Sequence, residues 1–127
     1  MKIDHIAIWT DNIENEKDFL LKYFNCTVGN KYSNPVKRFS SYFITFDGGA
    51  RIELMQRDDI SEGRTGETFG LAHFAVDVGS RSSVDKLTQL LESDGHIIVS
   101  HPRITGDGYY ESVILDPEKN IIELMSH

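Results

Sequence analysis

Residues 51–55 read Arg-Ile-Glu-Leu-Met, and residues 121–125 read Ile-Ile-Glu-Leu-Met. A second pair of matching stretches accompanies them: residues 3–8 read Ile-Asp-His-Ile-Ala-Ile, and residues 71–76 read Leu-Ala-His-Phe-Ala-Val. The two histidines, at 5 and 73, lie 68 positions apart, and the two glutamates, at 53 and 123, lie 70 positions apart. Two different motifs that return in the same order at almost the same offset indicate an internal duplication. The sequence therefore predicts two related modules.

The segments that follow each histidine motif predict one helix per module. Thr10-Asp11-Asn12 is a typical helix start, because Asp and Asn side chains accept hydrogen bonds from free backbone N–H groups. Residues 79–83 supply a serine-rich start in the second module, and Gly95 is placed to end that helix. The apolar stripes expected to face the core are Ile13, Phe19, Leu20, Tyr23 and Phe24 in the first helix, and Val84, Leu87, Leu90 and Leu91 in the second.

Strand-like runs complete each module, which then reads as strand, helix, and two or three further strands. They cover residues 3–8, 41–46 and 51–55 in the first module and residues 71–76, 96–100, 111–115 and 120–125 in the second. The polar stretch from 57 to 69 reads as a linker between module one, about 1–56, and module two, about 70–127. A module of about 60 residues is marginal alone, so we expect both to form one domain over 1–127 or to exchange between chains.

Composition excludes several classes of protein. The chain has 127 residues, 39% of them hydrophobic, and a formal net charge of −7. A phosphate backbone needs a basic surface, so nucleic acid is not an expected partner. No apolar run reaches the 18 residues of a membrane span, and the first residues lack a signal-peptide pattern. The single cysteine, Cys26, cannot form an internal disulfide, which agrees with a cytoplasmic location.

Strand alternation predicts where the ionisable residues of the two motifs lie. His5 and His73 alternate with apolar neighbours, and Glu53 and Glu123 are each flanked by an isoleucine and a leucine. Because successive side chains of a strand point to opposite faces, the apolar rows can pack beneath the helices. The two histidines and the two glutamates then lie on the other face, at matching positions of the two modules.

Two imidazoles and two carboxylates form a suitable ligand set for a divalent transition metal. Six-coordinate geometry would leave two positions for water or substrate, which favours Lewis-acid catalysis. A closed structural zinc site more commonly uses cysteines. Taken singly, a strand histidine is usually a hydrogen-bonded or exposed residue, and a glutamate between isoleucine and leucine usually lies on the solvent side of an edge strand. It is the recurrence of both in the two modules that favours a metal site.

Other residues are weaker candidates for substrate binding. Trp9 shares the expected face of His5, but core packing explains it equally well. Tyr109 and Tyr110 follow Gly106-Asp107-Gly108, a stretch that could cover a substrate or simply form a hairpin. Arg38 could attract an anionic group, but a solvated loop is the safer interpretation.

The motifs together resemble those of the vicinal oxygen chelate superfamily, which includes glyoxalase I, bleomycin-resistance proteins and ring-cleaving dioxygenases. The resemblance covers residues 3–8, 51–55, 71–78 and the stretch 106–124, Gly-Asp-Gly-Tyr-Tyr-Glu-Ser-Val-Ile-Leu-Asp-Pro-Glu-Lys-Asn-Ile-Ile-Glu-Leu. It implies an α+β fold in which two βαβββ modules form a curved, open mixed sheet around a metal. It also implies His5, Glu53, His73 and Glu123 as the ligands of that metal.

The order His, Glu, His, Glu is similar to that of small glyoxalase I enzymes, the lactoylglutathione lyases. The resemblance thus implies conversion of a 2-oxoaldehyde–thiol hemithioacetal to a 2-hydroxyacyl thioester through an enediolate, as in methylglyoxal detoxification. Glu123 is the expected base and Glu53 the second candidate. The resemblance further implies one divalent ion per site (nickel, cobalt or zinc) and a homodimer.

Alternatives remain open at this point. Ala7-Ile8-Trp9 stands where small glyoxalases carry an arginine that contacts the glutathione carboxylate, so another thiol or substrate is possible. A thiol transferase or a dioxygenase on the same scaffold is a second hypothesis. The third is a non-catalytic, drug-binding protein that holds a small aromatic compound with Trp9, Tyr109 and Tyr110.

Overall fold

Two units divide the chain in the computed structural model, which describes residues 1–63 and 66–127. The first unit is Met1–Gly63 and the second is Arg64–His127. Residues 64–65 of the predicted linker, 57–69, lie outside the described residues. Within the described residues, each unit contains one helix and its own mixed sheet, so each is described by itself.

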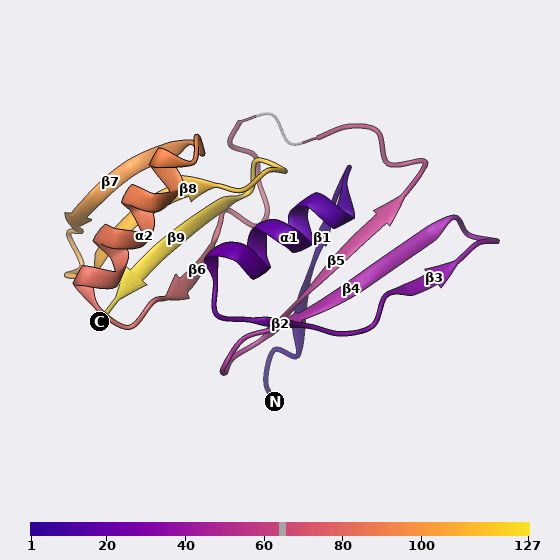
Figure 1. Ribbon diagram of the computed structural model, residues 1–127, viewed down its shortest axis with the longest axis horizontal. Helices are drawn as coiled ribbons and strands as arrows, with labels where there is room; N and C mark the ends of the chain where they lie inside the picture. Colours follow the sequence, from indigo (N-terminus) through magenta and orange to yellow (C-terminus); the bar gives the residue numbers. More distant parts are fainter. Residues whose placement is uncertain (64–65) are drawn as a thin grey trace. The chain divides into compact units, whose positions relative to one another are not determined.

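The first unit is a sheet of five strands with one helix (Figure 1). The strand order is β1-β5-β4-β2, with β3 also paired to β4; β1 runs parallel to β5, and the other pairs are antiparallel. The elements are β1 (His5–Trp9), α1 (Ile13–Tyr23), β2 (Thr27–Val28), β3 (Tyr32–Asn34), β4 (Phe39–Thr45) and β5 (Arg51–Arg57).

The second unit repeats this arrangement with four strands (Figure 1). The strand order is β6-β9-β8-β7, with β6 parallel to β9 and the remaining pairs antiparallel. The elements are β6 (Phe74–Asp77), α2 (Arg81–Ser93), β7 (Ile98–Ile104), β8 (Tyr110–Leu115) and β9 (Ile121–Ser126).

The predicted α+β fold built from βαβββ modules is confirmed, with two differences. The strands of the described residues form two sheets, one in each unit, where a single curved sheet was expected. In the first unit β2 and β3 together take the place that β7 holds in the second, and neither was predicted. The chain between them keeps one pairing to β4, because the Gly29 N–H donates to the Phe43 carbonyl at 3.0 Å.

Both helices begin where their caps were expected. The Asn12 side chain accepts a hydrogen bond from the Asn15 N–H, and the Ser80 side chain accepts one from the Ser83 N–H. Gly95 follows the end of α2 with a φ of 88°, the left-handed conformation that favours glycine. No helix in the described parts of the chain is both long and apolar enough to cross a membrane.

The helix stripes were predicted correctly for α1 and incompletely for α2. All five residues expected on the first stripe are buried: Ile13, Phe19, Leu20, Tyr23 and Phe24. On α2, Val84 and Leu91 are fully buried, but Leu90 is exposed and Thr88 is buried instead. The buried Thr88 hydroxyl is satisfied, because it donates a hydrogen bond to the Val84 carbonyl at 2.7 Å and lies 2.6 Å from the Ser112 hydroxyl.

Candidate metal centre

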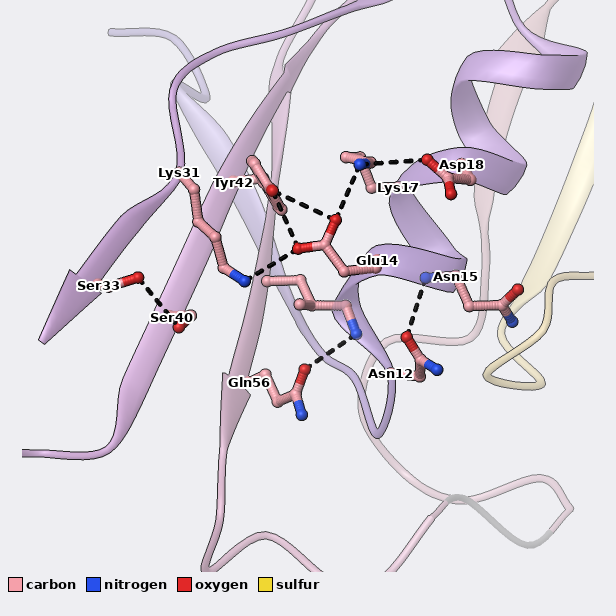
Figure 2. A network of polar contacts seen from close by, with 11 residues as sticks. Asn12, Glu14, Asn15, Lys17, Asp18, Lys31, Ser33, Ser40, Tyr42 and Gln56 are labelled. Carbon is pink, nitrogen blue, oxygen red and sulfur yellow. Dashed lines mark hydrogen bonds and ion pairs between the residues drawn. The ribbon is translucent and has the colours of Figure 1, made fainter. Parts of the chain in front are cut away.

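In each unit, the helix covers one face of the sheet and leaves the other face to the predicted ligands. In the first unit, the Tyr42 hydroxyl of β4 donates to the Glu14 carboxylate of α1, and the Gln56 side chain of β5 accepts from the Ile13 N–H (Figure 2). These two side chains therefore lie on the helix side. Glu53 lies three positions before Gln56 along β5, so its side chain lies on the opposite face.

His5 and Glu53 come together on that opposite face. Glu53 is directly opposite Ala7 in the β1–β5 register, two residues after His5. The His5 Nε2 lies 3.5 Å from a Glu53 carboxylate oxygen, and the Phe43 ring meets the imidazole edge-on at 5.3 Å between centroids. The Glu53 side chain is mostly buried, at 17% exposure. The strands thus assemble a partly buried imidazole–carboxylate pair.

The second unit builds the same pair at the same register. Glu123 is directly opposite Ala75 in the β6–β9 register, two residues after His73. The His73 Nε2 lies 3.2 Å from a Glu123 carboxylate oxygen, and the Glu123 side chain is 20% exposed. The predicted strand start at 71 was wrong, because β6 begins at Phe74 and His73 lies just before it. His73 nevertheless precedes Ala75 by two residues, as His5 precedes Ala7, and each alanine is opposite the glutamate of its unit.

The two separations fit neighbouring ligands of one metal ion. Ligand atoms about 2.1 Å from a metal, at angles between octahedral and tetrahedral, lie about 3.0–3.4 Å apart. The observed nitrogen–oxygen distance of 3.2 Å in the second unit falls within this range, and the distance of 3.5 Å in the first unit lies just above it. Across the described residues, no three His, Cys, Asp or Glu side chains gather into a metal-binding group. Each unit by itself therefore brings together two of the four predicted ligands.

Two further histidine–carboxylate pairs differ in their surroundings. His101 lies 2.9 Å from Glu92, and His127 lies 3.9 Å from Asp77. Both carboxylates are at least half exposed, unlike those of Glu53 and Glu123. Exposed ion pairs of this kind contribute little energy and are easily replaced by water, so they do not resemble a preorganised ligand pair.

Asp4 and Arg51 lie beside His5 and were missed as site residues. An Asp4 carboxylate oxygen lies 2.9 Å from the His5 Nδ1 and 2.6 Å from an Arg51 guanidinium nitrogen. The hydrogen bond with His5, followed by that with Arg51, lowers the pKa of Asp4. Asp4 belongs to the stretch 3–8, but its contact with Arg51 arises only because β5 pairs with β1.

Glu111 is a second carboxylate, besides Glu123, on the ligand face of the second unit, and the sequence analysis did not single it out. It is opposite Met125 in the β8–β9 register, next to the Glu123 position on the same face, and is 8% exposed. Burial and then the charge of Glu123 raise the pKa of Glu111, against the effect of Arg103, whose guanidinium lies 3.4 Å away. The corresponding position in the first unit, opposite Met55, holds Ser41. The duplication could not reveal Glu111, because that residue has no acidic counterpart.

The family model for the Glyoxalase/Bleomycin resistance protein/Dioxygenase superfamily matches residues 2–124 of this chain. The chain belongs to that superfamily. The match spans both units and contains both imidazole–carboxylate pairs. No curated protein is similar enough to this superfamily member to count as a match.

Solved structures show the same fold at low sequence identity. Glyoxalase I from Zea mays superposes with a TM-score of 0.82 at 20% identity, over 99% of this chain and 44% of the maize chain. The trypanothione-dependent glyoxalase I of Leishmania major gives 0.80 at 18% identity, over 99% and 86% of the two chains. A superfamily domain from Frankia sp. EAN1pec gives 0.84 at 16%, over 99% and 97%. This superfamily member thus spans less than half the length of the maize enzyme.

Of the two candidate substrate residues of the first unit, one lies on the His5 face of the sheet and the other lies in an exposed turn. Trp9 is on the His5 face of β1, where its ring meets Phe39 edge-on at 6.3 Å and the Arg57 guanidinium at 4.9 Å. It remains 39% exposed, so it is available to a ligand on that face of the superfamily fold. Arg38 lies in the turn before β4, largely exposed, and its guanidinium pairs with Asp58 at 2.7 Å.

The two tyrosines of the second unit lie on opposite sides of its sheet. The Tyr110 hydroxyl donates to Asp85 on α2 at 2.6 Å, and the Arg81 guanidinium lies 5.2 Å from the ring, so Tyr110 faces the helix. The structure therefore does not bring Tyr110 to the Glu123 face. Tyr109 precedes β8 and its ring packs against His127 at 5.4 Å, beside the end of β9.

Proposed function

We propose that the chain is a metal-dependent enzyme of the glyoxalase I type. Its substrate would be the hemithioacetal of a 2-oxoaldehyde and a small thiol, and its product the 2-hydroxyacyl thioester. The observation that supports this most directly is the recurrence of one imidazole–carboxylate couple in both units, where the glutamate is opposite the alanine two residues after the histidine. Membership of a superfamily that includes glyoxalases also supports this function, although it does not specify the reaction.

His5, Glu53, His73 and Glu123 would hold one divalent ion, for which nickel, cobalt or zinc suits the donor set. When bound, such an ion supplies Lewis-acid stabilisation of negative charge on two adjacent substrate oxygens. Each unit contributes two of the four ligands, so we include in the proposal that a homodimer assembles complete sites from the pairs of its chains.

The protein's own part in the reaction is proton transfer. A carboxylate oxygen of Glu123 would take the proton from the thiol-bearing carbon and return it to the neighbouring carbon. The hydroxyl proton of the thiol-bearing carbon passes to the oxygen of the neighbouring carbon, so that a carbonyl and a hydroxyl exchange places and the overall composition of the substrate is unchanged. Glu123 is suited to this because its carboxylate lies 3.2 Å from the His73 Nε2 and its side chain is only 20% exposed, so it would lie beside the bound ion and the substrate. Glu53 would serve from the other side in the equivalent position.

The test begins with elemental analysis of protein purified without added metal. Methylglyoxal is then supplied with glutathione and with several other thiols, and thioester formation is followed. We expect about one divalent ion per four-ligand site and thioester formation with at least one thiol. A fully metal-loaded protein that forms no thioester with any of them would exclude the glyoxalase reaction.

A second candidate, a non-catalytic binder of small aromatic compounds, is favoured by the surroundings of Trp9. Its exposed ring, together with Phe39 and Tyr32, forms an aromatic group on the His5 face. Trp9 is the single tryptophan of the chain, so quenching of its fluorescence reports binding directly. Quenching by bleomycin that persists in the presence of a chelator, without turnover of any oxoaldehyde, would favour this alternative.

A further inference from the structure

The two histidines of the proposed metal centre differ in their neighbouring charged residues. In the first unit Asp4 precedes His5, and Arg51 stands two positions before Glu53; in the second unit these places hold Ala72 and Ile121. The duplication therefore preserved the imidazole–carboxylate pairs but placed a charged carboxylate next to one imidazole only.

Arg51 contacts both the backbone and the side chain of Asp4. The backbone carbonyl of Asp4 accepts a hydrogen bond from the Arg51 N–H at 3.0 Å, which continues the β1–β5 pairing by one residue. Its side chain accepts from the Arg51 guanidinium at 2.6 Å, and that guanidinium lies 4.4 Å from the centre of the Phe43 ring. The same Phe43 ring packs against His5. The Asp4 side chain is 62% exposed, so the contacts with Arg51, and not burial, place its carboxylate beside the imidazole.

This geometry decides which imidazole nitrogen carries the proton. An ionised carboxylate can only accept hydrogen bonds, so the His5 Nδ1, 2.9 Å from Asp4, must be the donor. In neutral His5 the Nε2 is then unprotonated, and its lone pair points toward the Glu53 carboxylate 3.5 Å away. Two electron-rich atoms that face each other across this distance favour a cation between them.

We propose that Asp4 is a positioning residue, which the Arg51 guanidinium holds against His5 so that the His5 Nε2 is kept free for a divalent metal. The effect of Asp4 on metal binding rests on the proposed function, whereas its effect on the tautomer of His5 does not. Partners of this kind typically change metal affinity 10- to 100-fold on mutation. His73, which follows Ala72, serves as an internal comparison without such a carboxylate.

The first measurement is the tautomer of both histidines in metal-free, unsubstituted protein. Long-range proton–nitrogen correlation spectra at about pH 8, above the usual imidazole pKa of about 6.5, distinguish the two ring nitrogens. We expect His5 to carry its proton on Nδ1 and to lose that preference in Asp4→Asn, while His73 is unchanged. A His5 proton on Nε2 in the unsubstituted protein would overturn the proposal.

The second measurement is metal affinity, by titration of the metal-free protein with cobalt(II) or nickel(II). We expect Asp4→Asn to weaken binding about 10- to 100-fold with the same stoichiometry. The control is Asp59→Asn, since Asp59 also pairs with an arginine, Arg57, but does not contact a ligand; it should bind metal as the unsubstituted protein does. Equal affinity in Asp4→Asn would overturn the proposal, whereas failure of the unsubstituted protein to bind metal would overturn the proposed function and leave the tautomer result decisive for Asp4.

Discussion

Glu53 and Glu123 show how a strand position limits the exposure of a side chain to solvent. Each lies between two fully or largely buried apolar residues, on a strand paired on both sides, and its carboxylate is less than a quarter exposed. Glu92 faces a histidine at 2.9 Å as well, yet it stays half exposed at the surface of α2. Restricted solvation, rather than the presence of a histidine neighbour, separates the candidate ligands from ordinary surface pairs.

At this scale we predict the effect of replacing the proposed base. Glu123→Gln keeps an oxygen that can bind a metal but removes the group that accepts a proton. We expect kcat for thioester formation to fall by about 10²–10⁴-fold, the usual contribution of general acid–base catalysis, while metal content changes little. Steady-state kinetics and elemental analysis measure the two effects.

The matched control is Glu92→Gln, which alters a glutamate–histidine pair outside the candidate centre. It should retain full turnover. Undiminished turnover in Glu123→Gln would remove Glu123 from the role of base and leave Glu53 as the remaining candidate.

The elements of the first unit are joined by a polar network around Glu14 (Figure 2). The Glu14 carboxylate on α1 accepts hydrogen bonds from Lys17 at 2.8 Å, Lys31 at 2.9 Å and the Tyr42 hydroxyl at 3.0 Å. Tyr42 belongs to β4 and Lys31 to the chain before β3, so a single carboxylate ties the start of the helix to two other segments. The Lys17 hydrogen bond, followed by that of Lys31, lowers the pKa of Glu14 to about 2.

At the element scale this network predicts a pH dependence of stability. The pKa of Glu14 is lowered on folding from 4.5 to about 2, so its stabilisation is complete above about pH 4.5 and is lost as the pH falls toward 2. Because its side chain is nearly half exposed, solvent screening limits the effect, and we expect Glu14→Gln to cost about 1 kcal/mol or less at neutral pH.

Urea unfolding at pH 7 and at about pH 3 tests this. The decrease in the free energy of unfolding caused by Glu14→Gln should be smaller at about pH 3, where the Glu14 carboxylate of the unsubstituted protein stabilises the fold less. An equal decrease at both pH values would show that the charge of Glu14 does not stabilise the fold.

For the whole molecule, the division of the ligands between two units has a thermodynamic consequence. Neither unit supplies more than two of the four proposed ligands, so a metal ion held by all four is bound only when both kinds of unit are folded. Binding that is restricted to the native state raises the free energy of unfolding by an amount set by the free metal concentration.

We therefore predict that metal stabilises the protein against heat. At a free metal concentration of 100 times Kd the gain is about 2.7 kcal/mol, which corresponds to a rise in Tm on the order of 10 °C for a chain of this size. Calorimetry with and without a chelator measures it. The double substitution His5→Ala with His73→Ala should abolish the rise, and an equal rise in that variant would place the metal elsewhere.

The sequence by itself determined the duplication, the α+β class, the caps of both helices and the four residues of the two imidazole–carboxylate pairs. These features are readable because they are local or periodic: alternation selects a strand face, a cap residue precedes a helix, and a repeated motif marks the same place twice. The likeness of residues 51–55 to 121–125 carried more information than either stretch alone.

Tertiary structure alone decided what surrounds those residues. The pairing of β1 with β5 brings Arg51 and Asp4 against His5, and the β8–β9 register places Glu111 beside Glu123. It also turned Tyr110 toward α2 and exposed Leu90, which the sequence pattern had placed in the core. Strand register and helix rotation depend on contacts between segments far apart in the chain, and those contacts leave no periodic signal in the sequence.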